Sequence, residues 1–394
     1  MATTQTLVTP LISNEGLSEE TEVLDPVMPL GACLRFVFIT TPILLWDGIR
    51  LLGVVIALSP GFVRFAWYYF VTSRRIVKRY APDSRRQFLD IYTAKDASDA
   101  PLTSSNPLRD DEEETCVLAP VVIFLTGGAW IIGYKMWAAL LARALVVAGV
   151  VVVVPDYRNY PGATVPAMVQ DSDAAIEWAK EHVHEFGGDK DKIVLVGQSA
   201  GGHLAFMRTL LRATRGMDHR SDTTEHEAVD VKGCILLSTP FNIRAMGRTF
   251  SRHGFDNRLV DRVFGHDLES YDPTQVVQRL LTEHPAGLAE YLPPIRIYNA
   301  TSDRTVPHDL ALSFHEHFSN LVSGTELFAY DGWSHTDAIL EKIMDADHRF
   351  HRDVFRAVEE WTETSLHWPD ERSVELRRLC PSLMVKAGRF CNPF

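Results

Sequence analysis

One ten-residue stretch indicates the fold of this chain most clearly: Ile193-Val194-Leu195-Val196-Gly197-Gln198-Ser199-Ala200-Gly201-Gly202. Its first four residues are large and apolar, which predicts a buried strand. Gly197, Ser199 and Gly201 then form a G-x-S-x-G pattern, and the residues that follow begin a helical run. In such a strand–turn–helix setting a sharp turn lifts the serine out of the sheet edge, at the positive end of a helix. We therefore predict that Ser199 is a nucleophile.

Apolar runs rich in β-branched residues recur before and after this stretch and alternate with helical segments such as residues 165–186. The expected strands cover residues 85–92, 121–125, 150–154, 193–197, 234–238, 295–300 and 326–330. Strands that alternate with helices form a mostly parallel sheet with helices on both faces. We therefore expect one large α/β core.

A serine nucleophile needs a base and an acid, and the chain offers a candidate for each. Asp303 follows the predicted strand 295–300, and His335 follows the predicted strand 326–330. Alone, Asp303 could be a capping residue and His335 a surface histidine. The order serine, aspartate, histidine is that of α/β-hydrolases, and parallel strands place their carboxyl ends at one sheet edge. We predict an α/β-hydrolase fold with Ser199, Asp303 and His335 as the catalytic triad.

Backbone donors for a tetrahedral oxyanion are expected on two sides of the serine. Ala200 follows the nucleophile and supplies one N–H group. The second site is the loop Thr-Gly-Gly-Ala-Trp directly after the strand 121–125, where Gly127 and Gly128 let backbone N–H groups approach a substrate closely. We predict Gly127, Gly128 and Ala200 as the oxyanion hole; the alternative for the glycines is a tight turn that binds nothing.

Other polar residues near these motifs receive no chemical role. Residues 156–161 follow a strand, and we expect their polar groups to tie loops together beneath the site. Asp171 and Asp173 lie on the next helix and are expected to be solvated or capping carboxylates. His203 is expected to pack within the elbow helix.

The composition argues against two features, nucleic-acid binding and a metal site. The chain has 394 residues, is 46% hydrophobic and carries a formal net charge of -12. Nucleic-acid binding requires a concentrated basic surface, which this acidic balance does not indicate. The five cysteines are scattered and show no metal-ligand spacing, so we expect a reduced, cytosol-facing domain without a metal site.

The N-terminal part differs from the rest of the chain. Residues 1–28 are polar and acidic, lack the pattern of a secretory signal, and are expected to form a disordered tail. Residues 29–73 are strongly apolar, and each half approaches the ~20 residues that a spanning helix needs. Arginines and a Ser-Pro-Gly break are awkward at membrane depth, so we expect membrane association by spans or by interfacial helices. The basic residues that follow predict a cytosolic flank: Arg74, Arg75, Lys78 and Arg79.

The rest of the chain is expected to form a catalytic domain over residues 74–365 and a C-terminal tail over residues 366–394. Residues 95–115 are polar and acidic without periodicity, which indicates a surface loop. The chain ends in Cys-Asn-Pro-Phe, which has the outline of a prenylation signal. Its two middle residues are not aliphatic, so we do not expect Cys391 to be prenylated.

Three stretches carry a resemblance to a known family: TGGAWIIGYK at residues 126–135, GQSAG at residues 197–201 and SHTD at residues 334–337. Together they resemble the isoprenylcysteine α-carbonyl methylesterases, a membrane-associated branch of the carboxylesterases. The likeness runs over about residues 63–361. Related esterases commonly begin the glycine loop with histidine, whereas this chain, like the methylesterase branch, has Thr126.

The resemblance implies hydrolysis of the methyl ester on a prenylated cysteine, borne by a protein C-terminus or a small molecule, without a cofactor. It also implies a location at endoplasmic reticulum or Golgi membranes. The apolar residues 29–73 would let a prenyl chain approach along the bilayer. Trp130, Trp137 and Phe241 are candidates for an acyl pocket, although aromatic residues more often belong to the core. The oligomeric state stays open.

Two other functions share parts of this pattern. A soluble arylformamidase or general carboxylesterase would carry the same triad, but the apolar N-terminal region argues against it. A ligand receptor built on the hydrolase fold usually lacks part of the triad, and here all three residue types stand in context.

Overall fold

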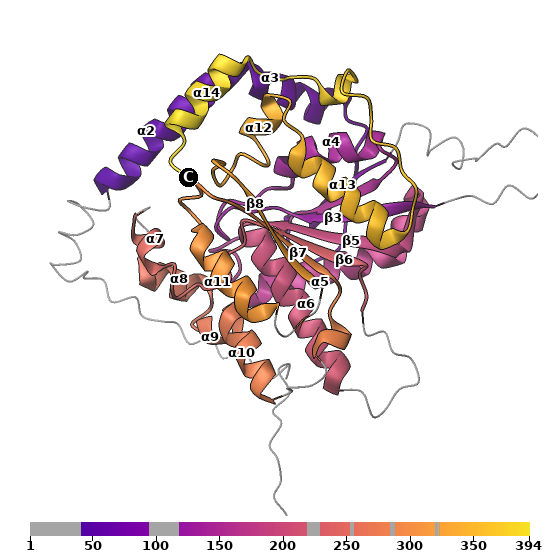
Figure 1. The fold of residues 1–394 in the computed structure, drawn as a ribbon, viewed down its shortest axis with the longest axis vertical. Coiled ribbons are helices and arrows are strands. Elements are labelled where there is room, and N and C mark those ends of the chain that lie inside the picture. Colours follow the sequence, from indigo (N-terminus) through magenta and orange to yellow (C-terminus); the bar gives the residue numbers. More distant parts are fainter. Residues whose placement is uncertain are drawn as a thin grey trace, which may run out of the picture.

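An eight-stranded sheet forms the centre of the computed structural model, which describes residues 41–93, 118–218, 229–252, 256–283, 288–319, 322 and 324–394. The expected acidic tail 1–28 and surface loop 95–115 lie outside the described residues, as do residues 29–40 of the apolar region. Figure 1 shows the sheet crossing the middle of the molecule, with helices around it.

The strand order is β1-β2-β4-β3-β5-β6-β7-β8. β1 and β2 join the sheet by antiparallel pairing, and every pair from β4 to β8 is parallel. The strands are β1 Ile76–Arg79, β2 Phe88–Tyr92, β3 Ala119–Leu125, β4 Val151–Pro155, β5 Gly188–Gln198, β6 Gly233–Leu237, β7 Ile295–Ala300 and β8 Thr325–Tyr330. This arrangement, with its sheet flanked by helices, is the α/β architecture that the sequence predicts.

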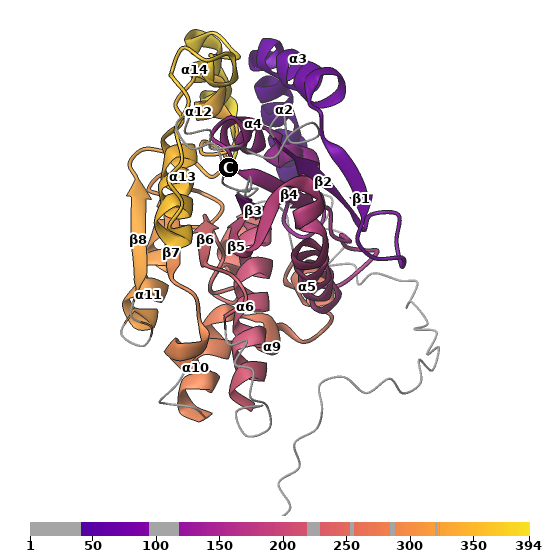
Figure 2. The same ribbon diagram turned by 90° about the vertical axis from the view of Figure 1, so that its right-hand side faces the viewer.

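Helices cover both faces of the sheet (Figure 2). The helices packed through one core are α5 Val165–His182, α6 Ala200–Asp218, α10 Pro273–Glu283 and α11 His308–Phe318. Those packed through the other are α2 Thr41–Ala57, α3 Ser59–Trp67, α4 Ala139–Val147, α12 Glu341–Met344, α13 Arg349–Thr362 and α14 Ser382–Cys391. Shorter elements are α7 Gly247–Arg252, α8 Asn257–Val263, α9 Leu268–Tyr271 and the turns η2 Tyr68–Thr72, η3 Lys135–Ala138, η4 Val183–Phe186, η5 Leu288–Tyr291 and η6 Val374–Leu376.

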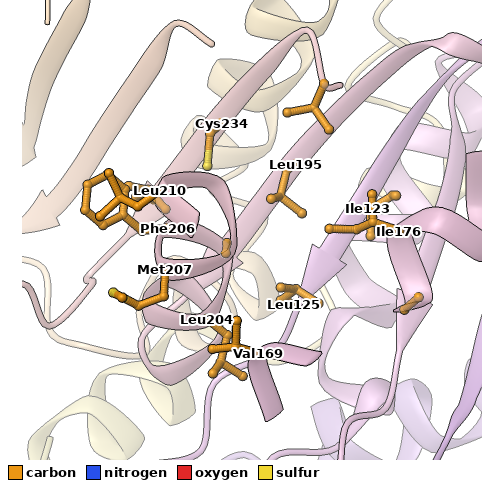
Figure 3. Close-up of a cluster of buried hydrophobic side chains, with 14 of the residues drawn as sticks. Ile123, Leu125, Val169, Ile176, Leu195, Leu204, Phe206, Met207, Leu210 and Cys234 are labelled. Atoms are coloured by element: carbon orange, nitrogen blue, oxygen red, sulfur yellow. The ribbon is translucent and has the colours of Figure 1, made fainter. Parts of the chain in front are cut away.

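Two cores form because successive side chains of the central strands point to opposite faces of the sheet. In β3, Ile123 and Leu125 point to one core, whereas Val122 and Phe124 point to the other. Because successive strand residues face opposite sides, a strand buried on both faces must be apolar throughout. Figure 3 shows Ile123 and Leu125 together with Leu195 of β5 and with side chains of α5 and α6. This packing fixes β5 and α6, which meet at the predicted elbow.

The apolar N-terminal residues form α2, α3 and η2. Val54, Leu58 and Phe65 are buried against the second core, while the opposite face is exposed. Among the described residues, no single helix is both long and apolar enough to cross a membrane. Length and composition suffice only for α2 and residues Ser59–Thr72 taken together, and these two parts are bent by 69°.

The C-terminal segment differs from the expected tail. Residues 366–394 contain η6 and α14, and α14 packs along α2 (Figure 1). Two glycines allow this close contact, because a Cβ on Gly53 would lie 3.0 Å from Cys391 Sγ and one on Gly388 would lie 3.0 Å from Leu58. The sequence separation of these partners exceeds 300 residues, so no local pattern indicates the contact.

Candidate active site

Ser199 stands between β5 and α6 in a strained turn. Its backbone φ is 53°, a left-handed value that non-glycine residues rarely adopt. The Ser199 N–H group donates to the carbonyl of Leu237 on β6, at 2.8 Å, which ties the turn to the neighbouring strand. Strain of this kind persists where the surrounding structure holds it, and it concentrates at functional sites.

Asp303 and His335 reach Ser199 because their strands are neighbours. β7 and β8 run parallel, and each of the two residues lies just beyond the end of its strand. His335 Nδ1 donates to Asp303 Oδ2 at 2.8 Å, and Ser199 Oγ donates to His335 Nε2 at 2.9 Å. The three side chains predicted as a triad thus form one continuous hydrogen-bonded chain.

The backbone of its own loop holds the Asp303 carboxylate. Asp303 Oδ1 accepts from the N–H groups of Thr305 at 2.9 Å and Val306 at 2.7 Å. Oδ2 is left to face His335. Ser199, Asp303 and His335 are each 7% exposed, so water competes little with these hydrogen bonds.

The glycine loop passes directly over the elbow. A Cβ on Gly127 would lie 2.1 Å from Gln198 Oε1 and 2.9 Å from Ser199 Cβ, so a larger residue does not fit. Gly128 has a φ of +131°, and a Cβ there would lie 2.3 Å from the nitrogen of Gly133. Ala200 is the first residue of α6, where an N–H group has no acceptor within the helix. The loop and the helix start flank Ser199, as the predicted oxyanion hole requires.

Gln198 is a neighbour of the triad that the sequence does not single out. Its Nε2 lies 3.4 Å from His335 Nε2, and its side chain fills the space beside Gly127. The G-x-S-x-G pattern leaves this position open, so no signal in the sequence indicates the contact.

The three aromatic candidates for an acyl pocket lie in different surroundings. Trp130 is buried and donates from Nε1 to His203 Nδ1 at 3.3 Å. Phe241 is 1% exposed and stacks on Phe314 at 4.1 Å between ring centroids, within the core. Trp137 is half-buried in η3. Trp130 and Phe241 both belong to the first core.

His203 packs in the elbow helix, as expected of it. Its Nε2 donates to the carbonyl of Tyr271 at 2.7 Å, and burial lowers its pKa to about 4. The imidazole is therefore neutral at physiological pH, and it supports Trp130 at the end of the glycine loop.

Two carboxylates expected to be solvated or capping are instead paired. Asp171 is 2% exposed and accepts from Arg158 at 2.7 Å, and Asp173 accepts from Arg208 at 2.8 Å. Asp156 ties loops together, as expected, by accepting from Arg86 at 2.8 Å. Burial raises the Asp156 pKa to about 6 despite Arg86.

A cavity of about 570 Å³ lies between the first half of α2, the end of α7 and the two residues Arg304 and Pro393. Ile43 and Trp46 of α2 line its apolar side, and Arg252 and Arg304 line its polar side. Arg304 directly follows Asp303 in the sequence, but none of the three triad side chains lines this cavity.

This arrangement has the parts for nucleophilic catalysis at an acyl group. A serine hydroxyl lies within reach of a base, the base is oriented by a buried carboxylate, and backbone donors flank the serine. Across the described ranges, no group of three or more histidine, cysteine, aspartate or glutamate side chains could hold a metal ion.

Comparison with known proteins agrees with the predicted fold. The family model described as BD-FAE matches residues 110–318. Esterase B from Lactobacillus rhamnosis superposes with a TM-score of 0.57 at 17% identity, covering 80% of this chain and 96% of that one. At this identity the likeness shows the fold alone, which is the predicted α/β-hydrolase fold.

Proteins of similar sequence show which family the chain belongs to. The chain is 31% identical to a probable isoprenylcysteine α-carbonyl methylesterase of Arabidopsis thaliana, over 86% of this chain and 66% of that protein. It is 30% identical to a second Arabidopsis thaliana protein, an isoprenylcysteine α-carbonyl methylesterase, over 86% of this chain and 74% of the relative. These findings confirm the prediction that the protein is a carboxylic ester hydrolase. The chain belongs to the isoprenylcysteine α-carbonyl methylesterase family.

Proposed function

We propose that this esterase hydrolyses the methyl ester of a prenylated cysteine through Ser199, His335 and Asp303. The observation that carries the proposal is the hydrogen-bonded chain from Asp303 through His335 to Ser199 at the elbow. The family supports the substrate, because the relatives are named for the isoprenylcysteine methyl ester.

The reaction proceeds in two halves. Ser199 Oγ attacks the ester carbonyl carbon while its proton passes to His335 Nε2, and Asp303 stabilises the imidazolium. The bond to the methoxy oxygen then breaks, His335 returns the proton to that oxygen, and methanol leaves. Water attacks the acyl-serine in the same way, with His335 taking its proton. Release of the prenylcysteine carboxylate restores the Ser199 hydroxyl.

The oxyanion of each tetrahedral intermediate would be bound by backbone N–H groups of the glycine loop and of Ala200. The close approach of Gly127 to the elbow supports this role, because it brings the loop backbone within contact distance of Ser199. Donors of this kind stabilise charge that develops only in the transition state.

The apolar helices at the N-terminus suit a prenyl substrate. Ile43 and Trp46 line the cavity beside Arg304, which gives a prenyl chain an apolar surface next to the acid loop. The exposed side of α2, α3 and η2 adds large apolar side chains, including Leu45, Trp67 and Phe70. We infer that this side rests on a membrane, from which a lipid-modified substrate would enter. The family suggests endoplasmic reticulum or Golgi membranes, with the catalytic domain in the cytosol.

The test compares three substrates: farnesylcysteine methyl ester, p-nitrophenyl butyrate and N-formylkynurenine. We expect the farnesyl ester to have the highest kcat/KM. Ser199→Ala should lower kcat by on the order of 10⁴-fold or more, because the nucleophile is lost. Ser302→Ala is the matched control, since Ser302 is an exposed serine beside Asp303, and it should leave activity unchanged.

The outcomes separate the functions. Ser199-dependent hydrolysis that favours the short ester or the formamide would leave the mechanism intact and contradict the prenyl substrate. Lack of turnover with every substrate, and no labelling of Ser199 by a fluorophosphonate, would contradict the hydrolase mechanism itself.

A further inference from the structure

The last helix of the chain contacts the loop that carries His335. Arg389 of α14 pairs with Asp337, with 2.8 Å between Nε and Oδ1. Its Nη2 also donates to the carbonyl of Gly332 at 2.8 Å. One guanidinium therefore bridges two points of the loop, three residues before His335 and two residues after it.

Asp337 depends on this partner. Its side chain is fully buried, and it accepts from the backbone N–H group of Ser334 at 2.7 Å. A buried carboxylate without an opposite charge is strongly unfavourable, and Arg389 supplies that charge. The planar fork of arginine suits a carboxylate and a carbonyl at once, which the point charge of lysine does not.

A second residue, directly after α14, donates hydrogen bonds to side chains of the same loop and of α12. Asn392 Nδ2 donates to Thr336 Oγ1 at 2.6 Å and to Glu341 Oε1 at 2.7 Å. Thr336 directly follows His335, and Glu341 begins α12. The loop is thus held by side chains from the C-terminal segment on both sides of His335.

The far side of α14 is fastened to α2. Arg50 donates from Nε to the carbonyl of Cys391 at 3.0 Å and from Nη2 to the carbonyl of Asn392 at 2.5 Å. Helix α14 is therefore held both by α2 and by the His335 loop.

We propose that Arg389 is a positioning residue for His335, so that the C-terminal helix completes the active site. His335 must keep hydrogen bonds to Ser199 and Asp303 at once, and a displacement of about 1 Å can cost on the order of 10²-fold in rate. Arg389 does not touch the reacting atoms; it acts by holding Gly332 and Asp337. The inference rests on the proposed role of His335 as the base.

The experiment uses the full chain and p-nitrophenyl butyrate, whose small acyl group needs no prenyl site. Arg389→Ala should lower kcat by roughly 10- to 100-fold while KM changes less than about twofold, because orientation rather than binding is lost. Arg378→Ala is the matched control: Arg378 lies on the same segment, its side chain is exposed and pairs with the half-buried Asp345 at 3.0 Å, and its loss should leave kcat unchanged.

Two further measurements separate positioning from general stability. Arg389→Lys keeps the charge beside Asp337 but cannot bridge to Gly332 with the same geometry, so kcat should fall by roughly 3- to 10-fold in a folded protein. Free guanidinium at millimolar concentration should restore part of the kcat of Arg389→Ala, and it should not raise the kcat of the wild type. Sodium chloride at the same ionic strength is the control.

A kcat of Arg389→Lys equal to that of the wild type would overturn the proposal. The proposal would also be overturned if the kcat lost in Arg389→Ala is not restored by guanidinium and is in proportion to the fall in Tm. These results would leave the proposed function standing, provided that the wild type shows Ser199-dependent hydrolysis. An inactive wild type would instead contradict the proposed function and with it the role of Arg389.

Discussion

Ser199, Asp303 and His335 lie 104 and 32 positions apart in the sequence, and single side-chain hydrogen bonds join them. Their residue types and order predict a triad, but their distances depend on three loops at the sheet edge. The buried carboxyl of Glu341 accepts from Thr336, the residue after His335, and is not indicated by any motif. The chemical role of a residue is thus predictable where a sequence pattern such as G-x-S-x-G encodes it. It is not predictable where the property, such as the raised pKa of a carboxyl, arises only from burial in the folded protein.

Glu341 gives a prediction about pH. Burial and the charge of Asp337 raise the Glu341 pKa from 4.5 to about 7. Between these values the folded protein holds a proton that the unfolded chain has released, so stability falls as pH rises through this window. Glu341→Gln removes the ionisation, and the Tm at about pH 8 should rise by roughly 2 to 4 °C. Thermal unfolding between about pH 5 and pH 8 should show a flatter profile for this variant.

Glu181→Gln is the control for this measurement, because the Glu181 side chain is 80% exposed. It should leave the pH dependence of Tm as it is in the wild type. An equally steep profile in Glu341→Gln would contradict the prediction.

The elements differ in how far the sequence indicates them. β3 and β6 coincide closely with apolar runs because each is buried throughout, whereas β5 begins at Gly188, before its apolar run, with residues that are partly exposed. β1 is not predicted: its four residues are all exposed, and two of them are basic. α14 is not predicted either, because it is stabilised by α2 and by the His335 loop rather than by a pattern of its own.

Helix α6 carries a prediction at this scale. Arg208 is 1% exposed on the side chain, and it pairs with Asp173 at 2.8 Å and with the buried Asp230 at 2.7 Å. Arg208→Leu would remove both hydrogen bonds from Arg208 to Asp230 and leave this carboxylate the more distant Arg212, at 3.7 Å, so the free energy of unfolding should fall by about 3 kcal/mol. Urea unfolding measures this change.

Arg215→Ala is the matched control on the same helix. Arg215 is 53% exposed and lies 3.6 Å from Asp173, so its loss should cost less than about 1 kcal/mol. The double variant Arg208→Leu/Asp230→Asn should recover part of the lost stability, because the buried charge that has lost its hydrogen-bonded partner is gone. Equal losses for Arg208→Leu and Arg215→Ala would refute the argument.

On the scale of the whole molecule, one side is apolar and exposed. α2 presents Leu45, Ile49, Leu52 and Ile56, which are 53 to 65% exposed and recur at the spacing of a helix face. The other face of α2 packs on the second core and on α14. An exposed apolar surface of this kind marks an interaction site, and a membrane suits the proposed substrate.

This face predicts membrane binding. Replacing Leu45, Ile49, Leu52 and Ile56 by glutamine should weaken binding to phosphatidylcholine vesicles by at least about tenfold, because each large apolar side chain contributes about 1.5 to 3 kcal/mol on burial. Hydrolysis of farnesylcysteine methyl ester in vesicles should fall, while hydrolysis of the soluble p-nitrophenyl butyrate stays within about twofold of the wild type. Vesicle co-sedimentation and the two rates measure the effect.

The control replaces Leu312 and Val374, which are 41% and 58% exposed on other elements, by glutamine. It should leave vesicle binding unchanged. Unaltered vesicle binding by the fourfold α2 variant would show that this face does not contact the membrane.

Local patterns in the sequence predict seven of the eight strands, the elbow and the identity of the three candidate catalytic residues. These features follow from short-range patterns: apolar strands, glycines around a serine, and polar residues placed just after strands. Only the packing of the whole chain shows which face of α2 is buried and that Arg389 reaches the loop of His335. Contacts between residues far apart in the chain depend on how all the elements pack, and no local pattern records them.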